Sequence, residues 1–268
     1  MIYSELAPAK LNLALHVRGK RPDGRHSLET VFAFCADGDV VEAELAGDCT
    51  LVVSGPFAAG LSAGDENLVL RAANALRDAA AIEAGAALHL KKNLPLASGI
   101  GGGSADAAAT LRLLTRLWKI DPVHASAVAP KLGSDVPACL LSISARGDGA
   151  GDELELLGDP GIAGTPVLLV NPGIPLSTGD VFAEWDGSDR GALGGWREGR
   201  NDLEAAATGL VPEIADVLAW LRKQPGADLA RMSGSGATCF ALFDGDKARD
   251  EAAAATPEGW WHLASELR

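Results

Sequence analysis

The sequence predicts an α+β fold, in which runs of strands are interrupted by helices rather than alternating strictly with them. Three observations support this class. Residues 7–17 alternate between apolar and polar side chains, as a strand with one buried face does. The glycines within residues 99–103 lead into an Ala- and Leu-rich segment with the composition of a helix. Residues 230–245 have the pattern of a strand, a tight turn and a second strand.

The remaining elements follow from the same patterns in chain order. Pro22, Asp23 and Gly24 predict a turn after the first strand. Asp65 is the predicted N-cap of the first helix. The expected strands are 7–17, 27–35, 39–45, 49–55, 87–93, a segment within 136–147, 165–173, the two strands of 230–245, and 260–267; the expected helices are 65–80, 104–118, 121–133, 211–226 and 247–255. Residues 186–202 lack these patterns, which predicts a boundary or a mobile loop there.

Composition excludes several classes of protein. The chain has 268 residues and a formal net charge of -13 that is spread along the sequence. Such a surface repels nucleic-acid backbones, so we predict no nucleic-acid partner. The four cysteines lack metal-site spacing and indicate reduced thiols in a cytoplasmic protein. The N-terminus lacks the features of a signal peptide, and no apolar run approaches about 18 residues, so no membrane partner is expected.

The glycine-rich stretch before the expected helix at 104–118 predicts an anion site. Glycines let backbone N–H groups approach a ligand closely, and a helix N-terminus adds unpaired donors and partial positive charge. Phosphate is the usual occupant of such a site. A flexible linker or a tight strand-to-helix turn is the alternative. The stretch is not a P-loop, because no Gly-Lys-Ser/Thr follows it, and Ser104 replaces the third glycine of a dinucleotide fingerprint.

Three motifs together resemble those of a known family. "PLASGIGGGSADAAA" resembles the central motif of the GHMP kinases, and "RMSGSGATCFALF" resembles their C-terminal glycine motif. "APAKLNLALHVRGKRPDGRHSLETVF" resembles the N-terminal block of one branch, which acts on a cytidine diphosphate polyol. "KLGSDVPACL", "ARGDGAGDEL", "LLVNPGIPLST" and "RNDLE" resemble the same branch, in the expected order. The resemblance extends over nearly the whole chain.

The resemblance implies a two-lobed GHMP-kinase fold with the active site between the lobes. Residues 1–155 would form the N-terminal lobe and residues 156–268 the C-terminal lobe. It further implies ATP-dependent phosphorylation of an alcohol with Mg²⁺, in the non-mevalonate route to isoprenoid precursors. The expected partners are therefore small molecules, namely ATP and a cytidine diphosphate polyol, and the expected assembly is a monomer or a homodimer.

The resemblance also assigns roles to residues. Asp135 would accept the proton of the acceptor hydroxyl, and Lys10 would keep that carboxyl ionised and stabilise the transferring phosphoryl group. Without the resemblance, Lys10 is an exposed strand lysine and Asp135 a turn or cap aspartate. The residues expected at ATP are Asn67, Pro95, Leu96, Ala97, Ser98, Gly99, Ile100, Gly101, Gly102, Gly103, Ser104 and Ala105; those expected at the acceptor are Asn12, Arg25, His26 and Thr178.

Several of these residues have a second interpretation. Ser104 could cap the helix, contact a phosphate oxygen or approach Mg²⁺, and Asn67 could be an ordinary polar residue at a helix start. The turn at residues 233–236 would close the site beneath the phosphates, or be only a hairpin turn. The basic residues around Arg25 could bind an anionic substrate or be a solvated hairpin tip. The branch usually has tyrosine before His26, stacked on cytosine; Arg25 stands there, and a guanidinium can also stack on a base.

Three other functions are consistent with parts of the sequence. The first is another GHMP kinase, acting on homoserine, mevalonate or a sugar. The second is a nucleotide-binding protein without catalysis, which the presence of both Lys10 and Asp135 disfavours. The third is a dinucleotide-binding oxidoreductase, which the imperfect glycine fingerprint disfavours.

Overall fold

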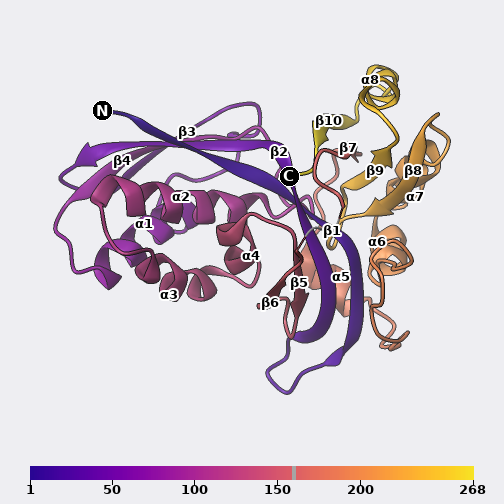
Figure 1. Ribbon diagram of the computed structural model, residues 1–268, viewed down its shortest axis with the longest axis horizontal. Helices are drawn as coiled ribbons and strands as arrows, with labels where there is room; N and C mark the ends of the chain where they lie inside the picture. The colour runs from indigo at the N-terminus through magenta and orange to yellow at the C-terminus, as the bar shows by residue number, and fades with distance from the viewer. Residues whose placement is uncertain (159–160) are drawn as a thin grey trace. The chain divides into compact units, whose positions relative to one another are not determined.

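The computed structural model of the chain describes residues 1–158 and 161–268. These residues form two compact units that are interleaved along the sequence. Unit 1 consists of Met1–Ala9, Asp37–Leu96 and Gly101–Ser142, and unit 2 of Lys10–Ala36, Ala97–Ile100 and Ile143–Arg268. Each unit combines strands with helices, so the predicted α+β class is confirmed (Figure 1). The division into lobes after residue 155 remains a proposal.

The elements occur in the following order. The strands are β1 (Tyr3–Lys20), β2 (His26–Ala46), β3 (Thr50–Ser54), β4 (Gly85–Lys91), β5 (Ala145–Asp148), β6 (Glu153–Leu156), β7 (Pro166–Asn171), β8 (Ala227–Met232), β9 (Cys239–Phe243) and β10 (Trp261–Glu266). The helices are α1 (Leu68–Ala79), α2 (Gly102–Trp118), α3 (Pro122–Leu132), α4 (Val136–Leu141), α5 (Thr178–Ala183), α6 (Glu204–Leu210), α7 (Glu213–Leu221) and α8 (Asp246–Ala254).

Unit 1 consists of a sheet with helices packed on it. β2 runs antiparallel to β4, from the pair Val40–Lys91 to the pair Ala46–Gly85, and β3 runs parallel to the other side of β4. Helix α2 packs against α1, α3 and α4, and Figure 1 shows these helices gathered on one side of the strands. The alanines of α2 are fully buried, which lets its neighbours approach closely. This packing fixes the helix that follows the glycines.

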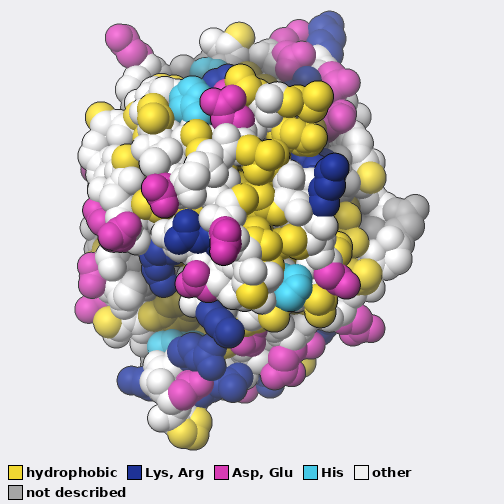
Figure 2. Space-filling view, turned by 90° about the vertical axis from the view of Figure 1, so that its left-hand side faces the viewer, with side chains coloured by type: hydrophobic (Ala, Val, Ile, Leu, Met, Phe, Trp, Pro, Cys, Tyr) yellow, Lys and Arg dark blue, Asp and Glu magenta, His cyan; other side chains and the backbone are white. Residues whose placement is uncertain are grey.

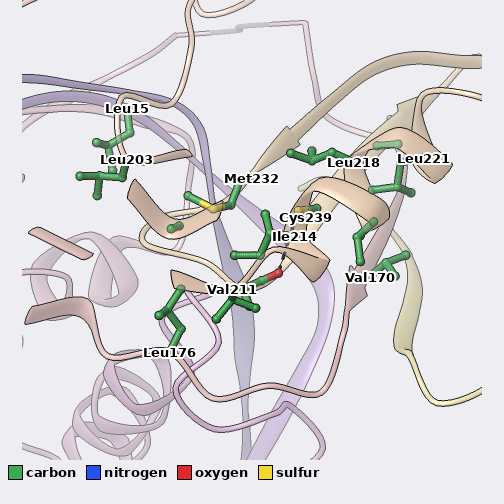
Figure 3. Close-up of a cluster of buried hydrophobic side chains, with 14 of the residues drawn as sticks. Leu15, Val170, Leu176, Leu203, Val211, Ile214, Leu218, Leu221, Met232 and Cys239 are labelled. Carbon is green, nitrogen blue, oxygen red and sulfur yellow. Dashed lines mark hydrogen bonds between the residues drawn. The ribbon is translucent and has the colours of Figure 1, made fainter. Parts of the chain in front are cut away.

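Unit 2 is built on an antiparallel sheet with the strand order β10-β7-β9-β8. Helix α7 packs against β7, β8 and β9, with Ile214, Val217, Leu218 and Leu221 buried at the spacing of one helix face. Figure 3 shows Ile214, Leu218 and Leu221 beside apolar side chains of the sheet and of the loops around it. Unit 2 also includes the adjoining parts of β1 and β2, with β5 antiparallel to β2 and β6 antiparallel to β5.

The structure confirms most predicted elements and corrects several boundaries. The strands expected at 27–35 and 39–45 form the single long strand β2. Asp65 is not the N-cap of α1, because Asn67 occupies that position and accepts the N–H of Val69. Helix α2 begins at Gly102 with Gly101 as its N-cap, so Ser104 is not a cap. Helix α7 ends at Leu221, well before the glycine predicted to terminate it.

The segment at residues 186–202 contains no helix or strand, in agreement with its sequence, but it is held by side chains of unit 2. Arg18 donates to Asp189, and the carboxylate of Glu29 accepts the N–H of Leu193 at 2.5 Å. His16 contacts the carbonyl of Gly191 at 3.0 Å. These bonds attach the segment to β1 and β2, so its course is defined by the strands rather than by local patterns.

Candidate active site

The part of the glycine stretch that belongs to unit 2 packs against the turn between β8 and β9. The carbonyl of Gly99 accepts the hydroxyl of Ser233 at 3.1 Å, and the carbonyl of Ser98 accepts the N–H of Thr238 at 3.1 Å. Gly99 has a φ of +76°, and a Cβ there would lie 2.5 Å from the carbonyl oxygen of Ser233 and 2.6 Å from that of Gly236. Only glycine fits this approach. The central and C-terminal glycine motifs are therefore in direct contact.

Strand β1 carries two buried polar side chains to the same place. The Lys10 ammonium donates to the amide oxygen of Asn12 at 2.8 Å and lies 5.5 Å from the ring centre of Phe32. The backbone N–H of Lys10 donates to Ile100, and that of Asn12 donates to the hydroxyl of Ser233. Both side chains are only 3 % exposed, so the interpretation of Lys10 as a solvated strand lysine is wrong.

Two further residues of unit 2 fix the turn at residues 233–236. The hydroxyl of Thr178, the first residue of α5, lies 2.8 Å from that of Ser235. The side-chain amide of Asn201 donates to the carbonyls of Met232 and Gly234, both at 2.8 Å. Thr178, one of the predicted site residues, therefore contacts the C-terminal glycine motif. Asn201 was not predicted as a site residue, although it lies in the "RNDLE" motif.

The part of the stretch that belongs to unit 1 is the start of helix α2. Gly101 adopts the left-handed conformation with a φ of 64° and ends the loop, and its carbonyl accepts the N–H of Ala105 at 2.8 Å. The first turn of α2 contains no acidic residue. The N–H groups of Gly102, Gly103 and Ser104 have no acceptor four residues earlier within the helix. With the helix dipole, they make this turn suitable for a phosphate.

Two further predicted residues of unit 1, Asn67 and Asp135, lie at helix starts. Asn67 caps α1 through its amide oxygen, and its amide nitrogen donates to the carbonyl of Ser62 at 2.6 Å. Its interpretation as a polar residue at a helix start is confirmed, and its contact with adenine remains a prediction. Asp135 precedes α4, is half-buried, and makes no capping hydrogen bond with its side chain. Since Asp135 belongs to unit 1 and Lys10 to unit 2, their pairing also remains a prediction.

The predicted acceptor residues at the β1–β2 turn have different surroundings. The His26 ring stacks on Phe182 with ring centres 4.6 Å apart and meets the edge of Trp185 at 5.5 Å. Burial, together with the charge of Lys20, lowers the pKa of His26. The guanidinium of Arg25 is exposed and pairs with Asp23 at 3.0 Å. The neutral form of His26 is therefore favoured, whereas the charge of Arg25 is partly compensated by its neighbour.

The basic residues of this turn are not a purely positive patch. In Figure 2, dark-blue Lys and Arg side chains gather at the lower end of the view, over the turn between β1 and β2. Each of three arginines there has a carboxylate partner: Arg18 pairs with Glu29 and Asp189, Arg21 with Asp23, and Arg25 with Asp23 and Asp152. The carboxylates weaken the field that would attract an anion. Recognition of an anionic acceptor by this turn stays a prediction.

Comparison with known protein families and solved structures identifies the fold. The profile of the "GHMP kinases N terminal domain" matches residues 67–142, and that of "GHMP kinases C terminal" matches residues 188–260. The chain belongs to the GHMP kinases. One similar structure is that of a 4-(cytidine 5'-diphospho)-2C-methyl-D-erythritol kinase, with a TM-score of 0.83 and 33 % sequence identity over 99 % of both chains.

Curated relatives give a finer classification of this GHMP kinase. A 4-diphosphocytidyl-2-C-methyl-D-erythritol kinase of Rhizorhabdus wittichii is 52 % identical, and the aligned region covers 99 % of this chain and 94 % of the relative. The enzyme of the same name from Brucella melitensis is 46 % identical, with 98 % of this chain and 94 % of the relative covered. A homoserine kinase structure from Cytophaga hutchinsonii has a TM-score of 0.74 at 18 % identity, covers 99 % and 95 % of the two chains, and shows the shared fold alone.

Three residues at the candidate site were not predicted from the sequence. They are Phe182, Trp185 and Asn201. Asn201 lies in a motif that resembles one of the GHMP kinases, so it could have been found by following that motif residue by residue. The two aromatic residues lie near α5, which is too short to produce a periodic pattern. Their proximity to His26 depends on tertiary packing.

Proposed function

We propose that this chain is an ATP-dependent kinase that phosphorylates the C2 hydroxyl of 4-(cytidine 5'-diphospho)-2-C-methyl-D-erythritol, a step of the non-mevalonate route to isoprenoid precursors. The observation that carries this proposal is the similarity over nearly the full length to kinases of that name, at up to 52 % identity. Homoserine and mevalonate are named for neighbours at 18 % and 10 % identity, which share only the fold. Phosphorylation of the cytidine substrate is therefore favoured over phosphorylation of another acceptor and over nucleotide binding without catalysis.

The proposed chemistry uses Lys10 and Asp135. Phosphoryl transfer needs positioning and charge stabilisation more than covalent participation by the protein. The carboxylate of Asp135 would accept the proton of the acceptor hydroxyl as the oxygen attacks the γ-phosphoryl group. The ammonium of Lys10 would favour the ionised carboxylate and stabilise the charge on the transferring group. The burial of Lys10 supports this role, because a buried cation interacts more strongly with charge than a solvated one does.

ATP would bind with its phosphates against residues 95–105. The first turn of α2 supplies N–H donors, and the contact between Gly99 and Ser233 gives the loop a fixed backbone. Mg²⁺ would enter as the complex with ATP. The described residues contain no group of three or more His, Cys, Asp or Glu side chains that could hold a metal ion. Such an ion would be held mainly by the substrate phosphates and by waters, as is usual for Mg²⁺ in kinase sites.

Recognition of the cytidine moiety is assigned to His26 with Phe182 beside it. A neutral imidazole has one donor and one acceptor nitrogen, which suits the edge of a base. The guanidinium of Arg25 is 55 % exposed and its ion pair with Asp23 is a surface pair, which costs little to break. Arg25 would therefore be able to stack on the base in place of the usual tyrosine. Asn12 and Thr178 are the other residues proposed to bind the acceptor substrate.

The cellular context follows from the proposed reaction. The four cysteines are free thiols, in agreement with a reducing compartment, and we propose the cytoplasm. Among the described residues, no helix has the length and apolar character needed to cross a membrane. The proposed partners are the two small-molecule substrates, without nucleic acid, and the proposed assembly is a monomer or a homodimer.

Analysis of the reaction product tests this function. The purified chain is incubated with Mg–ATP and the cytidine diphosphate substrate, and the product is examined by mass spectrometry and ³¹P NMR. The proposal predicts the mass of one added phosphoryl group and a phosphate on the tertiary C2 oxygen, which lacks coupling to a carbinol proton. An unmodified acceptor, or a phosphate that couples to such a proton, would refute it. The Asp135→Asn variant should make the product at a rate lower by about 10²–10⁴.

A further inference from the structure

Unit 1 contains a buried lysine held between two buried carboxylates. The ammonium of Lys92, which follows β4, donates to Asp106 of α2 at 2.7 Å and to Asp39 of β2. The exposed fractions of Lys92, Asp39 and Asp106 are 1 %, 0 % and 2 %. Burial of charges is unfavourable unless each is paired and hydrogen-bonded. These three residues are here called the lysine cluster.

The lysine cluster joins the chain that enters the glycine stretch to the helix that leaves it. The second oxygen of Asp39 accepts the N–H groups of Asn93 at 2.5 Å and Leu94 at 2.8 Å. These residues directly precede the glycine stretch. Asp106 lies in the second turn of α2, beyond the glycines. Through Lys92, the cluster therefore fixes the spacing between the two ends of the stretch.

The ammonium also lies directly beneath the first residue of α2. A Cβ at Gly102 would be 3.0 Å from the Lys92 nitrogen and 3.8 Å from the nearer Asp39 oxygen. The ammonium thus occupies the space beside Gly102 into which a side chain would extend. Movement of Lys92 would be transmitted to the first turn of the helix, where the N–H donors for phosphate lie.

The composition of the cluster is not what stability alone would favour. One carboxylate would be enough to pair Lys92, yet two are present, and the Oδ1 atom of Asp106 has no hydrogen-bond partner in residues 1–158 and 161–268. Burial is the main cause that raises the pKa of Asp106 to about 7, with the Asp39 carboxylate acting in the same direction and Lys92 opposing it. The buried residues of helix α1, which packs on α2, are all apolar. A well-packed apolar group would avoid this unfavourable burial.

We propose that Asp39, Lys92 and Asp106 are positioning residues for ATP, which hold the first turn of α2 and the preceding chain in the geometry that binds the phosphates. The cluster acts through the backbone of residues 94 and 102. This inference rests on the proposed function, because it takes ATP to be the ligand of the glycine stretch. Loss of the cluster should weaken ATP binding while leaving affinity for the acceptor unchanged.

Substitution of Asp106 tests the proposal by steady-state kinetics. Serine at position 106 is too short to reach Lys92, whereas asparagine keeps an oxygen acceptor of the same reach. The Asp106→Ser variant should raise KM for ATP about tenfold or more, with KM for the acceptor unchanged and kcat within about threefold. The Asp106→Asn variant should restore KM for ATP to within about threefold of the wild-type value. If the cluster were only structural, Asp106→Ser would lower thermal stability without a selective rise in KM for ATP, and Asp106→Asn would not restore that KM.

Two further variants complete the test: one is a control without a change of charge, and the other replaces Asp106→Ser if that variant does not fold. Thr110→Val removes the hydroxyl that donates to the carbonyl of Asp106 at 2.8 Å, without altering a charge, and should change only stability. If Asp106→Ser does not fold, Gly102→Ala replaces it, because its Cβ would displace the Lys92 ammonium by a few tenths of an ångström. Gly102→Ala should raise KM for ATP selectively. An unchanged KM for ATP, or equal rises in both KM values, would overturn the proposal.

Binding of a non-hydrolysable ATP analogue separates this inference from the proposed function. Titration calorimetry with the Mg²⁺ complex of the analogue needs no acceptor. If the wild type binds the analogue but phosphorylates no cytidine substrate, the proposed function fails and the cluster is still tested by Kd. If the wild type is active and Asp106→Ser binds the analogue as tightly as the wild type, the positioning role alone fails. Weaker binding by Asp106→Ser with recovery in Asp106→Asn supports it.

Discussion

Replacement of Gly99 by alanine is the sharpest test of the contact between the two glycine motifs. An alanine there would have to keep a φ of +76°, and its Cβ would lie 2.5–2.7 Å from three backbone atoms of Ser233 and Gly236. Backbone atoms in a buried turn cannot move aside as the end of a side chain can. The turn and the loop must therefore separate, which would disturb the backbone that supports the proposed ATP site.

The structure provides a matched control for the size of this effect. Gly187 has the same φ of +76°, but nothing lies within 4 Å of its Cβ position. A left-handed alanine costs about 1–2 kcal/mol, and this applies to both variants. Overpacking adds about 1–3 kcal/mol, and this applies only to Gly99→Ala. The free energy of unfolding should fall by about 2–5 kcal/mol in Gly99→Ala and by about 1–2 kcal/mol in Gly187→Ala.

Urea denaturation and steady-state kinetics measure the two consequences. Both variants restrict the unfolded chain equally. The difference between their unfolding free energies therefore measures the cost of the contact between the new Cβ at position 99 and the backbone of the turn. Gly99→Ala should also lower kcat/KM about a hundredfold, since small displacements of a binding loop have large kinetic effects. Gly187→Ala should retain wild-type kinetics. Equal stability losses in the two variants would show that the close contact between Gly99 and the turn is wrong.

Three further predictions concern stability. Leu218→Ala should lower the free energy of unfolding by about 2–5 kcal/mol, since Leu218 is buried in the core of unit 2; an unchanged urea midpoint would contradict this. Asn67→Ala should cost about 1 kcal/mol and Asn67→Asp much less, because aspartate also accepts the Val69 N–H; equal losses would rule out the cap. The folded state holds the Asp106 proton up to a pKa of about 7, against an ordinary value of 3.8, so ionisation of Asp106 lowers stability as the pH rises through this range. Asparagine at position 106 cannot ionise, so the Asp106→Asn variant should gain stability relative to the wild type as the pH rises between these two values. Urea titrations measure the difference in the free energy of unfolding, and a difference that does not change with pH would refute the raised pKa of Asp106.

Local patterns were sufficient to predict the elements with one buried face and the glycine motifs. The alternation along β1 is visible because successive side chains of a strand point to opposite sides. The central and C-terminal glycine motifs are visible because each is contiguous in the sequence. The direct contact between Gly99 and Ser233 could only be expected through the family resemblance, since the two residues are far apart in the chain.

Features that depend on tertiary packing were missed. Asp39, Lys92 and Asp106 each have the pattern of an ordinary surface charge, and only the fold brings them together in the interior. Asp65 and Asn67 are both good capping residues within one segment, and the packing of α1 decides between them. The burial of Lys10 was likewise not apparent, because the polar side of β1 is covered by other parts of the fold.

Release of ADP with a panel of acceptors distinguishes the proposed kinase from the alternative functions. The purified chain receives Mg–ATP with 4-(cytidine 5'-diphospho)-2-C-methyl-D-erythritol in one reaction and with homoserine, mevalonate or galactose in the others. We expect turnover with the cytidine substrate alone, and its loss in the Asp135→Asn variant. Turnover with another acceptor, or with none of them, would contradict the proposed function.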